Sequence, residues 1–70
     1  MHYTVIMHPA EEGGYWVEVP SLPGCFTQGE TVEDALRMSR LAIRSHVQAL
    51  RDDHKPVPSE KELVLARVEL

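Results

Sequence analysis

The chain has 70 residues, an apolar content of 43 % and a formal net charge of −4. The apolar content is that of a folded domain rather than a disordered tail. The acidic balance argues against nonspecific nucleic-acid binding as the main role, because affinity for phosphates depends on cationic side chains. A chain of this length buries only about 60 % of the surface that its unfolded form exposes. We therefore expect a single domain over residues 1–70 whose stability is marginal.

The cysteine content and the start of the chain bear on stability and location. Cys25 is the only cysteine, so no internal disulfide can stabilise the domain, and a lone thiol is typical of a reducing compartment. The first residues, MHYTVIMHPAEEGG, lack the basic and apolar regions of a signal peptide, and no stretch approaches the roughly 20 apolar residues of a membrane span. We expect a cytoplasmic protein without membrane contact. Association into a homo-oligomer, a dimer or a tetramer, would supply the missing stability.

The first two elements are expected to be the strands of a β-hairpin. Residues 3–7 (YTVIM) and 15–19 (YWVEV) are rich in β-branched and aromatic side chains, and a turn with Pro9 and a Gly-Gly pair separates them. Alternation along the second strand places Trp16 and Glu18 on the face opposite to the core. The expected core face consists of Tyr3, Val5, Met7, Tyr15, Val17 and Val19.

Prolines and glycines are concentrated in one connection, residues 19–31 (VPSLPGCFTQGET). Because proline cannot donate a ladder hydrogen bond, the chain must leave the sheet at Pro20. The pair Pro23-Gly24 fits the central positions of a type II turn, where glycine accepts a positive φ. Residues 25–28 (CFTQ) then predict a short third strand. The connection is interpreted as a rigid corner that turns the hairpin into this strand.

One long helix is predicted over residues 32–52. Thr31 is its expected N-cap, and Asp34 completes a sequence that approximates a capping box. The apolar spacing of three and four residues predicts a buried stripe made of Val32, Leu36, Ser39, Ile43, Val47 and Leu50, flanked by Ala35 and Ala42. The opposite, solvated stripe consists of Glu33, Arg37, Arg40, Arg44, Gln48 and Arg51. Within it, Glu33 and Arg37 have the spacing of a helical ion pair.

The end of the chain is expected to return to the sheet. Pro56 and Pro58 exclude continuation of the helix, and residues 62–70 (ELVLARVEL) predict a last strand. One face of this strand carries Val64, Ala66, Val68 and Leu70, and the other carries Leu63, Leu65, Arg67 and Glu69. The order β-β-β-α-β predicts a small α+β fold, an antiparallel sheet with one helix packed on one face. Pairing of the last strand within its own chain and pairing with a neighbouring chain both remain open.

The side chains that could carry catalysis do not form a recognisable site. A metal-dependent nuclease needs several carboxylates that converge from strands and loops, whereas Glu18 stands alone on the second strand. His2 and His8 are six residues apart on one strand, which corresponds to about 20 Å. No second cysteine accompanies Cys25 to form a zinc site, and a free cysteine is more often a small buried apolar side chain than a nucleophile. We expect no enzyme activity, no metal and no cofactor.

Two surfaces remain candidates for binding. Trp16 faces outward if its neighbours face the helix, and an exposed aromatic is a frequent interface anchor. Alternatively, its ring folds against the local loop at Leu22 and Pro23. The arginines of the helix could bind nucleic acid, but the acidic remainder of the chain favours a solvated helix face. These arginines are Arg37, Arg40, Arg44 and Arg51.

Residues 13–36, GGYWVEVPSLPGCFTQGETVEDAL, resemble the signature of HicB-type antitoxins. The Gly-Gly-Tyr hairpin, the Val-Pro-x-Leu-Pro-Gly-Cys corner and the Gly-Glu-Thr helix entry occur together and in order. The flanking elements extend the resemblance over nearly the whole chain. It implies a degraded RNase H-like β-β-β-α-β fold, frequent oligomerisation, and a role in neutralising a HicA-type toxin, a small mRNA-cleaving ribonuclease.

The chain departs from an active RNase H and from longer HicB antitoxins. Its first strand, HYTVIMH, lacks the carboxylate that an active RNase H needs, so the resemblance transfers no catalytic residue. Many HicB antitoxins continue into a C-terminal helix-turn-helix or ribbon-helix-helix domain that binds operator DNA. Because this sequence ends at Leu70, we expect a short form that has no DNA-binding domain and does not bind DNA.

The leading hypothesis is a noncatalytic antitoxin that covers the RNA site of a HicA-like toxin. Carboxylates would mimic phosphate towards the basic groups of the toxin, and the candidates are Glu11, Glu12, Glu18 and Glu30. The predicted partner-binding residues are Trp16, Glu18, Leu22, Pro23 and Phe26. One alternative is an RNA-binding or residual RNase H-like nuclease domain that uses Arg37, Arg40 and Arg44. Another is a purely structural oligomerisation module.

Overall fold

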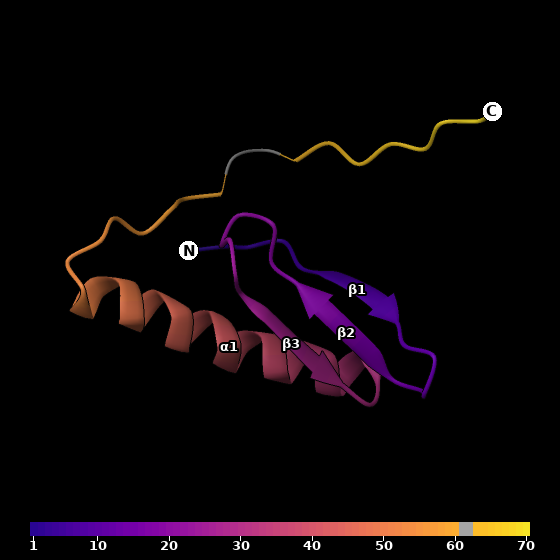
Figure 1. Ribbon diagram of the computed structural model, residues 1–70, viewed down its shortest axis with the longest axis horizontal. Helices are drawn as coiled ribbons and strands as arrows, with labels where there is room; N and C mark the ends of the chain where they lie inside the picture. The colour runs from indigo at the N-terminus through magenta and orange to yellow at the C-terminus, as the bar shows by residue number, and fades with distance from the viewer. Residues whose placement is uncertain (61–62) are drawn as a thin grey trace.

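Three short antiparallel strands form a sheet in chain order. The computed structural model describes residues 1–60 and 63–70, and its strands are β1 (Ile6–Pro9), β2 (Tyr15–Glu18) and β3 (Phe26–Gly29), arranged β1-β2-β3 (Figure 1). The first strand begins three residues later than its expected start. The pairing of Ile6 with Glu18 would continue to place Thr4 opposite Pro20, which has no N–H to donate. The sheet therefore ends before the N-terminal residues.

A tight turn joins β1 to β2. The N–H of Ala10 donates to the carbonyl of Gly14 at 3.0 Å, and the N–H of Gly13 donates back to the carbonyl of Ala10 at 3.0 Å. Gly14 has a φ of 72°, in the left-handed region that favours glycine. A Cβ there would also lie 2.7 Å from the carbonyl oxygen of Gly29. The expected Gly-Gly hairpin is confirmed, and Gly14 is required for the close approach of the β3 end.

The corner, which we define as residues 19–25, is closed by its own backbone. Val19 and Cys25 are joined by a hydrogen bond of 3.2 Å from the N–H of Val19 to the carbonyl of Cys25. The N–H of Cys25 donates to the carbonyl of Leu22 at 3.0 Å, and Gly24 has a φ of 84°, which is the geometry of a type II turn. The predicted turn is confirmed. Leu22 is fully buried at its centre.

Helix α1 (Val32–Asp52) has the predicted bounds and the predicted cap. The N–H of Asp34 donates to Oγ1 of Thr31 at 3.0 Å, while the carboxylate of Asp34 accepts from the N–H of Glu30 at 3.0 Å. The guanidinium of Arg37 forms an ion pair with the carboxylate of Asp34 at 2.6 Å. The expected pair of Glu33 with Arg37 is therefore wrong, because the capping hydrogen bonds hold the Asp34 carboxylate within reach of Arg37. Within residues 1–60 and 63–70, no helix is both long and apolar enough to span a lipid bilayer.

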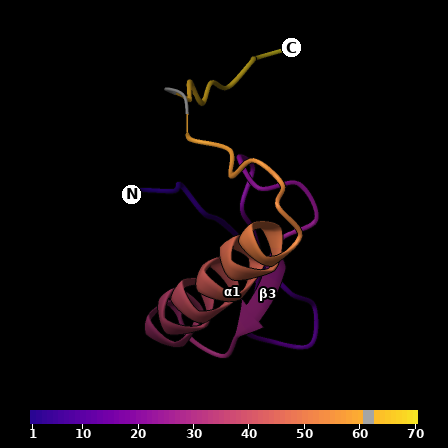
Figure 2. The same ribbon diagram turned by 90° about the vertical axis from the view of Figure 1, so that its left-hand side faces the viewer.

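The helix lies on one face of the sheet, mainly over β3 and less over β2 (Figures 1 and 2). Its buried side chains are Ala35, Ser39 and Val47, whereas Leu36 is 52 % exposed and Val32 is also exposed. The predicted stripe is therefore wrong at its first two positions. Because Gly29 has no side chain, the backbone of Ala35 approaches it so closely that a Cβ there would lie 2.4 Å from the Ala35 nitrogen. This contact rolls Ala35 towards the sheet and Leu36 away from it.

After the helix the chain returns to the N-terminal segment. Val57 packs against the core, the hydroxyl of Tyr3 donates to the carbonyl of Pro58 at 2.5 Å, and Oγ1 of Thr4 donates to the carboxylate of Glu60 at 2.9 Å. The backbone N–H of Thr4 donates to the same carboxylate. Residues 58–60 are thereby held beside the segment that precedes β1.

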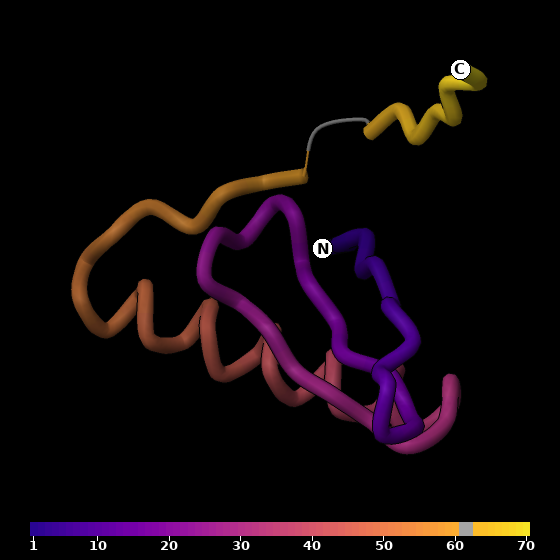
Figure 3. The backbone as a smooth tube through the Cα atoms, turned by 45° about the vertical axis from the view of Figure 1, so that its right-hand side comes forward, coloured from indigo at the N-terminus to yellow at the C-terminus, as the bar shows by residue number. Residues whose placement is uncertain are grey.

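The last segment does not join the sheet of its own chain. Glu62, the first residue of the expected last strand, lies outside the described residues, and residues 63–70 have no strand partner and are all exposed. Figures 1 and 3 show this segment running clear of the sheet. The small α+β fold with three antiparallel strands and one helix is confirmed. The described part of the expected last strand, residues 63–70, forms no strand and pairs with none of the described strands.

Candidate partner-binding surface

Within residues 1–60 and 63–70, no helix or strand covers the face of the sheet opposite α1. Val17 faces the helix and is fully buried, so its neighbours Trp16 and Glu18 point to the other side. Pairing places Trp16 between His8 and Gln28, and Glu18 between Ile6 and Phe26. We call this surface the open sheet face, made of Ile6, His8, Trp16, Glu18, Phe26 and Gln28. Trp16 is 42 % exposed and Phe26 is 63 % exposed, so two large aromatics are available to a partner.

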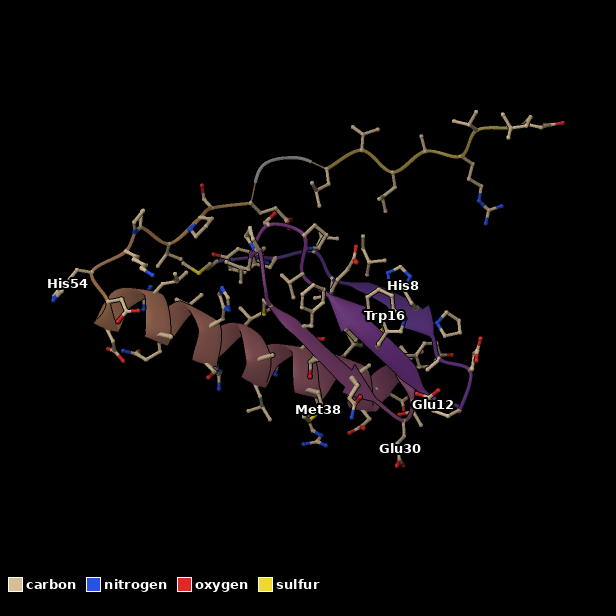
Figure 4. All side chains as sticks on the ribbon, viewed as in Figure 1. His8, Glu12, Trp16, Glu30, Met38 and His54 are labelled. Carbon is tan, nitrogen blue, oxygen red and sulfur yellow. The ribbon has the colours of Figure 1, made fainter. Side chains whose placement is uncertain are left out.

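The indole of Trp16 is held flat by a neighbour. The ring of His8 stacks on it with centroids 4.0 Å apart and an angle of 14° between the planes (Figure 4). Nε2 of His8 is buried without a hydrogen-bond partner among the described residues and lies 3.6 Å from the Glu18 carboxylate. This arrangement settles the alternative left open for Trp16: its ring packs on the adjacent strand, while Leu22 is in the core. A fixed aromatic loses little side-chain entropy on binding.

An acidic hollow adjoins Trp16 at the hairpin end of the sheet. It has a volume of about 660 Å³, and its lining includes Glu12, Trp16, Glu30, Asp34 and Met38. Figure 4 shows Glu12 and Glu30 at this end of the molecule and Met38 farther along α1. The hydrogen bond from the N–H of Glu30, followed by that from Arg37, holds the pKa of the Asp34 carboxyl below its ordinary value. Carboxylates beside an aromatic and a methionine suit a basic, partly apolar partner.

The structure brings together only part of the predicted site. Trp16, Glu18 and Phe26 share the open sheet face, and Pro23 is exposed on the corner. Leu22 is 0 % exposed, so the prediction that it contacts a partner is wrong; the two turns of the corner direct its side chain inward. Of the acidic candidates, Glu12 and Glu30 line the hollow, and Glu11 does not.

Sequence reasoning missed three side chains of this surface: His8, Asp34 and Met38. The position of His8 could have been predicted from the hairpin turn. The hydrogen bond between Ala10 and Gly14 closes this turn, and the resulting register places His8 opposite Trp16. Met38 belongs to neither the predicted buried stripe nor the predicted solvated stripe, and only the position of the helix start beside β3 brings it to the hollow.

Cys25 is a core residue. It is 4 % exposed and packs with Val19, Leu22 and Val47, and burial raises the pKa of its thiol. This confirms the interpretation of Cys25 as a small apolar side chain. In the part of the chain that the structure describes, no three His, Cys, Asp or Glu side chains come together as metal ligands would.

The helix arginines lie apart from the open sheet face. Arg37, Arg40 and Arg44 are exposed, and Arg37 is engaged with Asp34. Arg40 and Arg44 instead border a second hollow, between α1 and the N-terminal residues. The two candidate surfaces are therefore separate, with acidic groups near the sheet and basic groups on the helix.

Comparison with known proteins assigns the chain to a family. The model of the HicB-like antitoxin of bacterial toxin–antitoxin systems matches residues 3–69. A UPF0150 protein of Thermoplasma acidophilum is 45 % identical over 60 residues, which cover 86 % of this chain and 87 % of that protein. The antitoxin HicB of Escherichia coli K12 is 36 % identical over 58 residues, which cover 83 % of this chain and 42 % of that protein.

The two relatives differ in length relative to this chain. The match spans most of the Thermoplasma acidophilum protein but less than half of the Escherichia coli antitoxin, so the activity of the longer protein as a whole does not transfer directly. The family match itself covers nearly every residue. The chain belongs to the HicB-like antitoxin family of bacterial toxin–antitoxin systems.

Proposed function

We propose that the chain binds a HicA-type mRNA-cleaving toxin through the open sheet face and neutralises it by covering its RNA site. The observation that carries this proposal is the half-exposed Trp16, stacked on His8 and bordered by the acidic hollow. A protein that binds RNA presents cationic groups to phosphates. Glu12, Glu18 and Glu30 offer carboxylates to the same groups.

The mechanism is steric and electrostatic, without catalysis by this chain. Trp16 and Phe26 supply the apolar centre of the contact, since large aromatics dominate the binding energy of protein interfaces. The carboxylates around them raise the association rate and select a basic partner. The family assignment supports the role of an antitoxin, and the position of the acidic groups beside the aromatics supports this face as the contact.

A binding experiment with a purified HicA-type toxin tests the proposal. Trp16→Ala should weaken binding by at least about tenfold, as expected for an aromatic anchor, and Glu18→Lys should weaken it further and reduce its salt dependence. Arg51→Ala, an exposed change on the far end of the helix, is the matched control and should leave affinity unchanged. Calorimetry gives the affinity, and circular dichroism establishes that each variant is folded.

Two outcomes would contradict the proposal. Unchanged affinity in both open-face variants would move the toxin contact elsewhere. Binding of RNA by the chain alone, abolished by Arg40→Ala with Arg44→Ala and weakened steeply by salt, would favour the nucleic-acid function instead. The engagement of Arg37 by Asp34 at 2.6 Å argues against that alternative, because it partly neutralises the arginine face.

A further inference from the structure

The imidazole of His8 has an unpaired nitrogen on the open sheet face. Among the residues that the structure describes, Nε2 of His8 is buried and has no hydrogen-bond partner. A polar atom that has lost water without gaining a partner is costly to bury. The carboxylate of Glu18 lies 3.6 Å from this nitrogen, beyond the length of a normal hydrogen bond. The ring is still accessible to protons, because 38 % of the His8 side chain is exposed.

Strand register and stacking hold the imidazole and the carboxylate beside each other. His8 lies opposite Trp16, and Glu18 follows two residues farther along β2 on the same face. The indole of Trp16 stacks on the imidazole with 4.0 Å between the ring centroids, so the imidazole cannot turn freely towards water. A change of charge satisfies the unpaired nitrogen most directly, because it needs no rotation of the ring.

Glu18 is the one ionisable neighbour of His8 on the open sheet face, as far as the structure describes the chain. The remaining members of this face carry no charge at neutral pH, and they are Ile6, Trp16, Phe26 and Gln28. The corner, residues 19–25, contains no charged side chain either. Helix α1 and its arginines lie on the other side of the sheet (Figure 2).

The charged groups of the neighbouring segments lie elsewhere. The lining of the acidic hollow does not include His8, and its carboxylates are Glu12, Glu30 and Asp34. Glu11 is exposed on the hairpin turn, His2 borders the hollow beside α1, and Glu60 accepts hydrogen bonds from the segment before β1. Arg67 and Glu69 belong to residues 63–70, which run clear of the sheet (Figure 3). The charge of the open sheet face therefore depends on His8 and Glu18.

We propose that His8 and Glu18 form a proton switch on the open sheet face. Protonation gives the imidazole a positive charge and makes both of its nitrogens donors, so Nε2 of His8 then binds the Glu18 carboxylate in a charge-assisted hydrogen bond. The stack on Trp16 persists, because a cation is attracted to the face of an indole. With His8 neutral, the face carries one negative charge that is available to a partner. With His8 protonated, the face has no net charge.

The consequence for binding rests on the proposed function. The Glu18 carboxylate attracts a basic partner when His8 is neutral, whereas protonated His8 occupies that carboxylate and repels the same cationic groups. Binding and protonation therefore oppose each other, and by thermodynamic linkage each weakens the other to the same extent. Since histidine side chains exchange their proton between about pH 5 and 8, acidification within this range should weaken the contact with the toxin.

Carbon-13 NMR of the isolated chain tests the switch without any partner. The side-chain carboxyl resonance of Glu18 is identified as the one that Glu18→Gln removes. In the wild-type chain this resonance should show a step between about pH 5 and 8. A step in this range reports a histidine, because ordinary carboxyl groups titrate at lower pH. His8→Phe should abolish the step, since phenylalanine keeps an aromatic ring beside Trp16 but has no proton to exchange.

His54→Asn is the matched control for the NMR experiment. His54 is exposed at the end of α1 that is far from Trp16 (Figure 4), and asparagine tolerates its φ of 56°. The step should persist in this variant. Fluorescence of Trp16, the only tryptophan of the chain, and circular dichroism establish that each variant is folded. A wild-type resonance without the step, or a step that survives in His8→Phe, would overturn the proposal.

Affinity for a purified HicA-type toxin, measured at about pH 7.5 and at about pH 5.5, tests the consequence for binding. Acidification should weaken binding of the wild-type chain about fivefold more than binding of His8→Phe, and this comparison cancels the titration of the toxin's own groups. Glu18→Gln should show the pH dependence of His8→Phe. Equal pH dependence in the wild-type and His8→Phe chains would overturn the link to binding. An affinity that Trp16→Ala leaves unchanged would instead contradict the proposed function, whereas the NMR step concerns the isolated chain alone.

Discussion

The corner and the C-terminal arm, residues 63–70, are two short apolar segments that differ in burial. In the corner, Leu22 is 0 % exposed and Cys25 is 4 % exposed, whereas in the arm Val64 is 86 % exposed. The corner closes on itself, since Val19 and Cys25 share a backbone hydrogen bond. The arm, residues 63–70, pairs with none of the described strands. Apolar composition alone therefore does not bury a segment; its backbone must also find hydrogen-bond partners and a surface to cover.

This difference bears on the stability of the whole domain. The core cluster consists of Val19, Leu22, Cys25 and Val47, with partly buried neighbours around it. Three of these four residues belong to the corner. A small chain gains limited stability from such a core, and the exposed apolar side chains of the arm add little to it. The comparison can be tested by changing one residue of each segment in turn.

The largest effect is expected from truncating Leu22. Leu22→Ala removes a fully buried side chain and should lower the free energy of unfolding by about 3 kcal/mol, which combines lost burial with the cavity left behind. Leu65→Ala, on the exposed arm, should change it by less than about 0.5 kcal/mol in dilute solution. Urea unfolding followed by circular dichroism measures both. Similar losses in the two variants would mean that the arm is packed in the isolated chain.

Thiol reactivity should separate the same two segments without a large change in stability. Cys25 is buried, and burial raises the pKa of its thiol, so little reactive thiolate is present and access requires local opening. In a Cys25→Ser background, Ala66→Cys places a thiol on the arm. Alkylation by iodoacetamide at neutral pH should be about 100-fold faster at position 66 than at Cys25 of the wild-type chain. Equal rates would show that the corner opens freely.

The smallest effect on stability is expected at the start of the helix. This region belongs to neither the corner nor the arm and serves as a reference for both. The pKa of Asp34 is held below its ordinary value of 3.8, first by the N–H of Glu30 and then by Arg37. Its stabilising contribution is therefore present above that value and is lost as the pH falls through the lower folded pKa. Asp34→Asn should reduce the acid dependence of the urea midpoint, with a modest loss of stability at neutral pH. An unchanged acid profile would show that other carboxyls dominate it.

The amino-acid sequence by itself determined the elements that depend on local rules. The helix from Val32 to Asp52, its Thr31 cap and the type II turn at Pro23-Gly24 all follow from capping, periodicity and turn chemistry. The outward direction of Trp16 follows from the alternation of side chains along a strand. Each of these features depends on a few neighbouring residues, which is why the sequence was sufficient.

Only the tertiary structure decided which surfaces meet. The close approach of Ala35 to Gly29 rolls the helix, so that Leu36 borders a groove rather than the core, and the periodic pattern alone cannot fix such a rotation. The two turns of the corner bury Leu22, and strand register stacks His8 on Trp16. The hydrogen bonds of Pro58 and Glu60 to Tyr3 and Thr4 likewise join segments that are far apart in the chain. These outcomes depend on contacts between residues distant in the chain, which local propensities do not encode.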